Sequence, residues 1–180
     1  MSHRELRKFT AESLAATADD WKSIAGEDEF QAELSTLFEW CEDHLEHRDG
    51  DAFALDLYDP DTNHTGAILE IVRTKRGVMT KLLKLYPSPE FWNADSDPVQ
   101  RDALGRLYGD AFVSVIGDGI GLTDPSVIGS GTTEVDEIKI FGRTNAMYEL
   151  LRSVVLFWSS SHTGWDAKME GRWLALSRRK

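Results

Sequence analysis

Two carboxylates on neighbouring predicted strands are the first residues whose placement could support catalysis. Asp56 interrupts the apolar run AFALDLY, and Glu70 interrupts the run AILEIVR. A hairpin turning through residues 59 to 66, with His64 in the turn, could place the two carboxylates opposite each other. Paired carboxylates suit acid–base or metal-assisted catalysis, but they repel each other unless a proton or a cation intervenes. These three residues support one hypothesis, a small metal-dependent hydrolase or nuclease.

A cysteine and two histidines recur at steps of three in the clearest predicted helix. Cys41, His44 and His47 are residue types that bind zinc, and a helical step of three keeps neighbours within reach. However, Cys41 falls on the apolar stripe of this helix, where a free cysteine packs as a small hydrophobic residue. The histidines fall in its last turn, where partial positive charge is favourable. We therefore assign no metal ligand here.

Two further patterns imitate metal sites without completing them. The stretch that begins at Asp59 matches a calcium loop in its first, third, fifth and twelfth positions, but it has His64 where that loop requires glycine. Asp124 followed by Glu137-Ile-Lys139 resembles the metal-nuclease pattern of the restriction-endonuclease-like superfamily. In that superfamily the Glu-x-Lys element belongs on the third strand of the core, whereas here it follows the second helix. Neither pattern supports a metal site.

A cluster of glycines, Gly117-Asp-Gly119-Ile-Gly121, is the next candidate. A phosphate-binding glycine loop follows a strand and opens a helix. Here the order is reversed, because a predicted helix ends at residue 116 and Gly117 suits its C-cap. Residues 117–133 are therefore predicted to form a glycine-rich loop that binds no nucleotide. No other pattern identifies a catalytic residue, and no cofactor is predicted.

Charge is distributed unevenly along the chain. The net charge is −11, and residues 18 to 61 hold 15 acidic residues against two basic ones. An acidic helix face that could bind a basic protein partner comprises Glu39, Glu42, Asp43 and Glu46. Residues 71 to 89 contain only basic charges, and this basic hairpin is the only part of the chain expected to bind nucleic acid or another anion. Its candidate anion-binding residues are Arg73, Lys75, Arg76, Lys81 and Lys84.

Hydrophobic periodicity predicts the elements that position these residues. The predicted helices span 3–20, 27–47, 97–116 and 144–159, and the predicted strands span 52–58, 67–73, 78–86 and 134–142, with a strand or hairpin at 164–177. Residues 1–48 thus form a helical N-terminal part of a single domain, 1–180. The expected fold is α+β, with a mostly antiparallel sheet of a three-stranded meander plus one or two C-terminal strands, packed with four or so helices.

Composition limits the classes of protein to consider. A single cysteine excludes a disulfide framework. No apolar run approaches the ~18 residues of a membrane helix, and the first residues lack the apolar core of a signal peptide. We therefore expect a soluble, cytoplasmic protein without a membrane partner. The main hypothesis is a non-catalytic protein-interaction module, such as a subunit, adaptor, inhibitor or immunity-type protein. The hydrolase or nuclease is its alternative.

Overall fold

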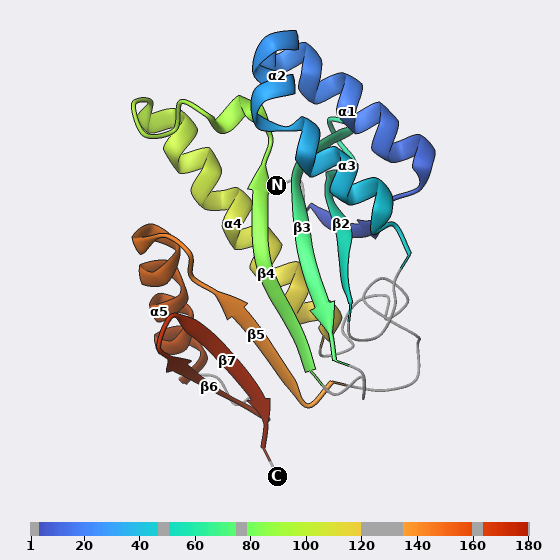
Figure 1. The fold of residues 1–180 in the computed structure, drawn as a ribbon. Coiled ribbons are helices and arrows are strands. Elements are labelled where there is room, and N and C mark those ends of the chain that lie inside the picture. Colours follow the sequence, from blue (N-terminus) through green and yellow to red (C-terminus); the bar gives the residue numbers. More distant parts are fainter. Residues whose placement is uncertain (1–3, 47–50, 75–78, 120–134, 160–163, 180) are drawn as a thin grey trace.

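A single mixed β-sheet organises the chain (Figure 1). The computed structural model describes residues 4–46, 51–74, 79–119, 135–159 and 164–179. Within these ranges seven strands follow the order β1-β2-β3-β4-β5-β7-β6. The strands are β1 (Glu5–Lys8), β2 (Ala52–Asp59), β3 (His64–Arg73), β4 (Met79–Pro87), β5 (Glu137–Phe141), β6 (Trp165–Glu170) and β7 (Trp173–Arg178).

One pair of neighbouring strands in this sheet is parallel. β4 pairs with β5 in parallel, whereas the other five pairs of neighbouring strands are antiparallel. A parallel pair needs a crossover connection, which is usually helical. Here the crossover contains the short 3-10 helix η1 (Pro89–Phe91) and the long helix α4 (Pro98–Gly119).

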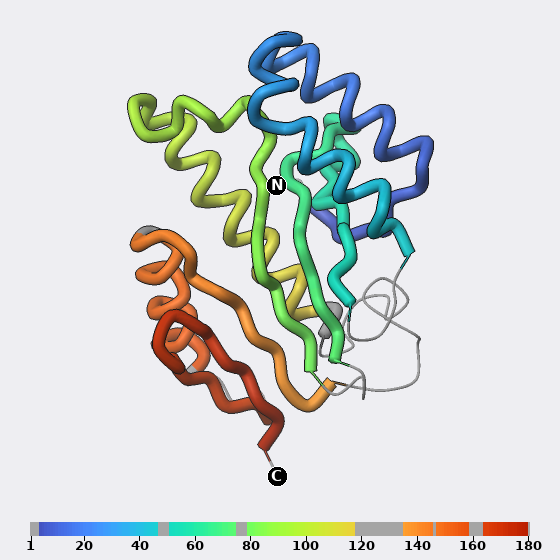
Figure 2. The backbone as a smooth tube through the Cα atoms, in the orientation of Figure 1, coloured from blue at the N-terminus to red at the C-terminus, as the bar shows by residue number. Residues whose placement is uncertain are grey.

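Helices cover both faces of the sheet. On one face lie α1 (Ala11–Ala25), α2 (Glu27–Glu33) and α3 (Ser35–Asp43), and on the other lie α4 and α5 (Asn145–Ser159). The smooth chain trace shows α1–α3 in front of β2 and β3 while α4 crosses behind β4 (Figure 2). The described helices include none that is long and apolar enough to cross a membrane.

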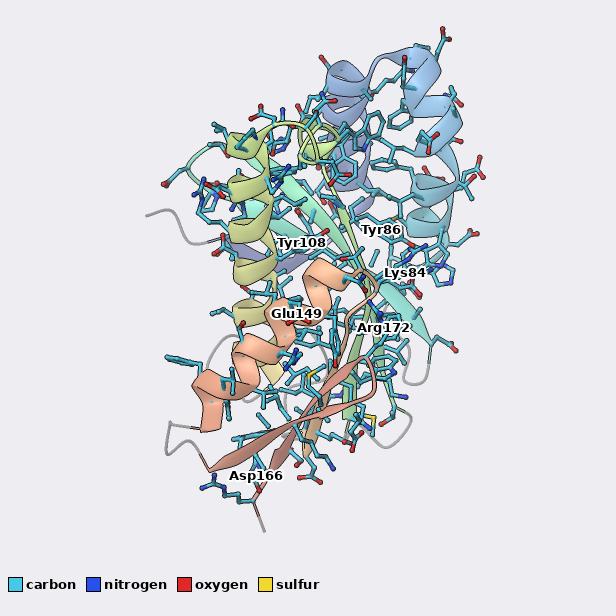
Figure 3. All side chains as sticks on the ribbon, turned by 90° about the vertical axis from the view of Figure 1, so that its left-hand side faces the viewer. Lys84, Tyr86, Tyr108, Glu149, Asp166 and Arg172 are labelled. Atoms are coloured by element: carbon cyan, nitrogen blue, oxygen red, sulfur yellow. The ribbon has the colours of Figure 1, made fainter. Side chains whose placement is uncertain are left out.

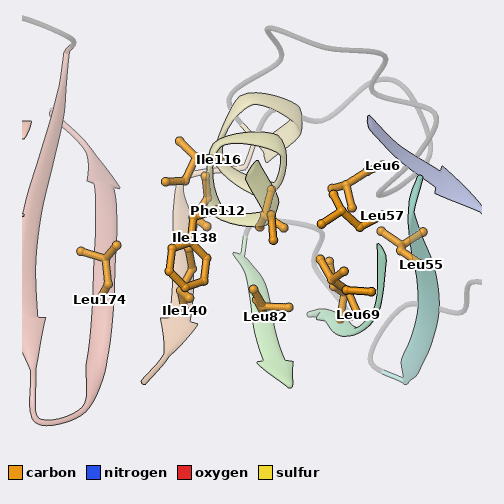
Figure 4. Close-up of a cluster of buried hydrophobic side chains, with 14 of the residues drawn as sticks. Leu6, Leu55, Leu57, Leu69, Leu82, Phe112, Ile116, Ile138, Ile140 and Leu174 are labelled. Carbon is orange, nitrogen blue, oxygen red and sulfur yellow. The ribbon is translucent and has the colours of Figure 1, made fainter. Parts of the chain in front are cut away.

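Alternation along the strands creates two hydrophobic cores. In β2, Phe53, Leu55 and Leu57 join the larger core, whereas Ala54 joins the smaller core under α1–α3. Figure 4 shows Leu55 and Leu57 within the larger core. Side chains of a strand alternate between faces with period two, so a single strand contributes to both cores. Trp21 of α1 is fully buried in the smaller core.

The predicted fold class is wrong. The three antiparallel strands expected between residues 52 and 86 are present as β2, β3 and β4, but they form the middle of a seven-stranded mixed sheet. The N-terminal strand β1 was not expected. The strand expected over 134–142 is present as β5, but it pairs with β4 in parallel. The C-terminal segment forms a hairpin, one of its two expected forms, and its turn contains Gly171 at φ 62°. The sequence pattern did not indicate parallel pairing, because the two paired segments are separated by a whole helical crossover.

Several element boundaries also differ from the prediction. Residues 5–8 form β1, where a helix over 3–20 was expected, and α1 begins after a capping box between Thr10 and Ser13. The helix predicted over 27–47 is divided at Leu34 into α2 and α3. Helix α4 continues past Gly117 to Gly119. The rest of the predicted glycine-rich loop lies outside the described residues.

Candidate functional site

The parallel strands β4 and β5 diverge within the sheet. Their ladder begins at Met79 and Glu137 and ends at Leu82 and Ile140, although β4 continues to Pro87. Figure 1 shows β4 continuing upward while β5 turns away from it. Among the described residues, the second half of β4 therefore has a strand neighbour on one side only, although it lies in the middle of the sheet. We call this the free edge of β4.

Backbone groups on the free edge are oriented by the pairing with β3. The Ser88 N–H donates to the Gly66 carbonyl at 2.9 Å, which continues the β3–β4 register beyond Ala67 and Pro87. Backbone groups of alternate residues in an antiparallel strand point to opposite sides. The N–H and C=O of Leu85 consequently point away from β3, to the side on which the ladder to β5 has ended. An extended ligand could pair with them as an added strand would.

Elements far apart in the sequence border this edge. Seen from the side, α4, the second half of β4 and the N-terminal end of α5 surround it (Figure 3). The side chains labelled around it in this view include Tyr108 from α4, Tyr86 and Lys84 from β4, and Arg172 from the β6–β7 turn. Burial raises the pKa of Tyr108, so its hydroxyl stays protonated at neutral pH.

A carboxylate, an ammonium and a phenol meet on β3 and β4 beside the free edge. Lys84 lies directly opposite Glu70 in the ladder, and its Nζ is 2.8 Å from Glu70 Oε2. The Tyr86 hydroxyl donates to the same oxygen at 3.3 Å. Tyr86 also packs against the smaller core, so this cluster lies on the α1–α3 face of the sheet.

Electrostatics fix the protonation states in this cluster. Burial is the main cause that raises the pKa of Tyr86, and the nearby Glu70 adds to the rise, while Lys84 opposes it. The hydrogen bond to Glu70 is the main cause that raises the pKa of Lys84. At neutral pH the cluster therefore holds a neutral phenol and an ammonium on one carboxylate. A half-buried phenol of this kind can give a proton to a leaving group.

The turn between β5 and α5 is held by Arg172. Its Nε donates to the Gly142 carbonyl at 2.7 Å and its Nη2 to the Arg143 carbonyl at 3.1 Å. Its guanidinium carbon lies 5.5 Å from the centre of the Tyr148 ring. These contacts fix the start of α5, which is the part of that helix nearest the free edge.

The start of α4 is closed to an anion. Pro98 has no N–H, the amides of Val99 and Gln100 face Asp97 Oδ1 at 2.8 and 3.5 Å, and the Arg101 amide donates to the Asp97 carbonyl at 2.9 Å. Helix N-termini bind phosphate through amides that lack partners, and none is left in this first turn. These residues therefore do not fit a ligand that would place a diphosphate here.

The predicted catalytic pair does not form. Asp56 lies opposite Ile68, and Glu70 lies opposite Ala54. Arg7 Nε is 2.6 Å from the fully buried carboxylate of Asp56. Burial raises the pKa of Asp56, and Arg7 opposes that rise. Each acid of the proposed pair thus has its own cation.

His64 does not join these carboxylates either. Its ring bridges α1 and η1, with Nδ1 2.6 Å from Asp20 and Nε2 3.4 Å from Glu90. Among the described residues there is no group of three or more metal-ligating side chains. Glu70 is the one member of the hydrolase hypothesis that belongs to the site at the free edge.

The cysteine and histidine of the zinc-like pattern have structural partners. Cys41 is fully buried, and burial above all raises the pKa of its thiol to about 12. His44 Nδ1 is 2.7 Å from the Trp40 carbonyl, and the two rings are stacked. His47 lies outside the described residues.

The calcium-like and nuclease-like patterns also have structural explanations. The Asp61 amide donates to Asp59 Oδ1 at 3.0 Å, which closes the turn between β2 and β3. Lys139 Nζ lies 3.3 Å from Glu137 and 2.9 Å from Glu170, so this pair belongs to an ion-pair cluster on the sheet. Asp124 lies outside the described residues.

The two predicted charged surfaces have different surroundings. The acidic face is exposed at the end of α3, and three of its members line a hollow of about 610 Å³ together with Asp51. These members are Glu42, Asp43 and Glu46, and Glu39 lies exposed on the same helix. Binding of a basic protein there stays a prediction.

The basic hairpin is only partly described. Arg73 is buried and Lys81 is half-buried, and Lys84 is ion-paired with Glu70. Lys75 and Arg76 lie outside the described residues. Anion or nucleic-acid binding by this hairpin also stays a prediction, and its member Lys84 takes part in the site at the free edge.

Sequence reasoning missed Tyr86 and Asp97 as functional positions. One signal was available for Tyr86: in the run VMTKLLKLY it follows Lys84 at a spacing of two, so both share one face of a strand. Asp97 stands at the start of the helix predicted over 97–116, and the sequence pattern gave it no role in ligand binding. Neither its effect on phosphate binding nor the position of the free edge can be inferred without the parallel pairing.

The chain matches no family model and no curated protein. Several solved structures match it, among them the following two, each of which covers nearly its whole length. One, provisionally named a ribosomal-protein-serine acetyltransferase from Vibrio cholerae, is 11% identical over 98% of this chain and 93% of its own, with a TM-score of 0.47. Another, a spermidine N-acetyltransferase chimera from Vibrio cholerae and hSSAT, is 13% identical over the same shares, with a TM-score of 0.41. At these values the likeness assigns no activity.

The names of these two structures differ from both sequence-based hypotheses. Both are named as acetyltransferases, and we do not retain the non-catalytic protein-interaction module or the metal-dependent hydrolase or nuclease as the function of this chain. The separate ion pairs of Asp56 and Glu70 give a physical reason against the hydrolase.

Proposed function

We propose that this chain is an acyltransferase that holds an extended, amide-bearing acyl donor along the free edge of β4. The observation that carries the proposal is the early end of the β4–β5 ladder at Leu82 and Ile140, while β4 continues to Pro87. Unpaired strand edges bind extended chains through main-chain hydrogen bonds. The backbone of Leu85 provides one donor and one acceptor for this purpose.

Side chains next to that edge suit the proton transfers of acyl transfer. The acyl carbon exchanges its bond to the leaving group for a bond to the acceptor. The acceptor's proton passes to the Glu70 carboxylate, and Tyr86 supplies a proton to the leaving group. Glu70 then returns a proton to Tyr86 along the hydrogen bond that joins them, which restores both groups. Both partners of Glu70 lie on the free half of β4, at Lys84 and Tyr86, so the cluster lies beside the edge along which the donor would be held.

Transfer assays with Tyr86→Phe test these roles. The full chain is incubated with S-acetylpantetheine and a panel of amines, and thiol release and acetylated product are measured. Because a positioned general acid contributes about a hundredfold or more, Tyr86→Phe should lower kcat by about that factor while the melting temperature is retained. Tyr58→Phe, a control on β2, should keep the activity of the wild type.

Two results would contradict the proposal. One is the absence of both binding and turnover with every acyl thioester tried. The other is an equal loss of activity in Tyr86→Phe and Tyr58→Phe, since a general effect of removing a hydroxyl would then explain the data.

A further inference from the structure

We infer that the donor held at the free edge of β4 is a neutral pantetheine-type thioester, selected against donors that carry a nucleotide diphosphate. The inference rests on the function proposed above and specifies its substrate. It is drawn from the start of α4, which follows β4 in the chain and lies to the side of the upper end of β4, beyond the end of β5 (Figure 1).

Backbone donors for a phosphate are missing there. In the first turn of α4, Pro98 has no N–H to donate. The N–H groups of the next three residues point at the carboxylate or the carbonyl of Asp97. The Arg101 guanidinium is also engaged, because its Nε donates to the Ala94 carbonyl at 3.2 Å and its Nη2 donates to the Asp95 carbonyl. A diphosphate would have to break these bonds before it could form its own.

Charge and shape at the same place disfavour a diphosphate further. The segment from Ser88 to Asp102 holds four acids, namely Glu90, Asp95, Asp97 and Asp102, against the single base Arg101. Like charges raise the cost of bringing an anion close, most strongly at low salt. No glycine occurs from Ser88 to Leu104, so every residue there has a side chain that limits the approach of a phosphate to the backbone.

An uncharged pantetheine thioester has no phosphate, so neither the engaged amides nor the acidic residues at the start of α4 oppose its binding. Its amides can pair with the backbone of Leu85 on the free edge, and Tyr108 of α4 offers a half-buried ring nearby. Leu85 itself packs against the larger core, so the apolar part of the arm would lie next to apolar surface. These are the contacts expected of a thioester arm that ends before any phosphate.

Paired binding measurements test the inference on the full chain. Dissociation constants for S-acetylpantetheine and acetyl-CoA are measured by calorimetry at low and at high salt. We expect S-acetylpantetheine to bind at least as tightly as acetyl-CoA. The ratio of the two dissociation constants should favour S-acetylpantetheine more strongly at low salt. A preference for acetyl-CoA of about tenfold or more would overturn the inference and leave the acyltransferase intact. Binding of neither compound would overturn both.

A charge variant tests the cause. Asp97→Asn keeps a residue that caps helices well and removes one charge, so we expect tighter binding of acetyl-CoA and unchanged binding of S-acetylpantetheine. Asp19→Asn, an exposed position on α1, makes the same change in charge on the other face of the sheet and should alter neither constant. An Asp97→Asn variant that leaves the ratio of the two constants unchanged would contradict electrostatic exclusion at α4.

Discussion

Tyr86 shows how a strand position acquires a chemical role. Its ring is half-buried against the smaller core, and its hydroxyl reaches Glu70 across the β3–β4 ladder. Burial keeps the phenol protonated, while Lys84 keeps a positive charge beside the carboxylate. A free carboxylate pair, which the sequence suggested, would instead require a metal or a shared proton. The register of β2 against β3 removes that requirement by giving each acid its own cation.

At the same scale, His64 gives the protein a dependence of stability on pH. The hydrogen bond to Glu90 is the main cause that raises the pKa of His64, and Asp20 contributes as well. Because the pKa of His64 is higher in the folded state, its protonated ring stabilises the fold. This stabilisation is complete below the pKa of an unfolded histidine, about 6.5. It is lost as the pH rises through the pKa of the folded state. Because Asp20 and Glu90 are almost half exposed, we expect a loss of roughly 1 kcal/mol or less.

Urea unfolding at pH values below and above the two pKa values of His64 measures the effect. The free energy of unfolding of the wild type should fall from mildly acidic to mildly alkaline pH by more than that of His64→Gln. Identical pH profiles for the two proteins would show that the ion pairs of His64 add nothing to stability.

At the scale of elements, some segments could be predicted from local pattern and others could not. The alternation of Phe53, Leu55 and Leu57 and the cap at Thr144 are local signals, and both appear in the structure. β1 has only Leu6 buried, so its four residues show no alternation that distinguishes a strand from a helix start. The break at Leu34 likewise lies inside an apolar stripe that continues across it.

Two glycines should respond oppositely to the same substitution. A Cβ on Gly142 would lie 3.0 Å from the Tyr148 Cα, at the turn that Arg172 holds, so Gly142→Ala should cost about 1–3 kcal/mol of stability. A Cβ on Gly105, in the middle of α4, meets nothing within 4 Å, so Gly105→Ala should add about 0.5–1 kcal/mol. Thermal and urea unfolding measure both. Equal stability of the two variants would contradict the packing described at the start of α5.

At the scale of the whole molecule, the site depends on pairing that sequence periodicity does not reveal. Glu70 and Lys84 were each considered as candidates, but for different functions. They meet because β3 and β4 form a hairpin, and the free edge exists because β5 returns beside β4 only as far as Leu82. The position of β5 depends on the α4 crossover that leads to it and on its pairing with β7 of the β6–β7 hairpin. Both involve residues that are far apart in the chain.

Net charge is also a property of the whole molecule, and it predicts a response to salt. The −11 charge is concentrated around α1–α3, where self-repulsion opposes the compact state. Raising NaCl from about 0.01 M to about 1 M shortens the screening length from about 30 Å to about 3 Å, so the melting temperature should rise. The double substitution Glu39→Gln and Glu42→Gln should reduce this gain. If the melting temperature of the variant rose by the same amount, the rise would be due to other effects of salt and not to screening of these charges.

The central claim is that an extended donor pairs with the free edge of β4, and hydrogen exchange tests it most directly. Exchange of the full chain is measured with and without saturating S-acetylpantetheine, in peptides that cover β4 and, for comparison, β2. The account predicts slower exchange in the segment Leu83–Tyr86, at the Leu85 amide, when the thioester is present, with β2 unchanged. Protection confined to other elements, or none at β4, would contradict it.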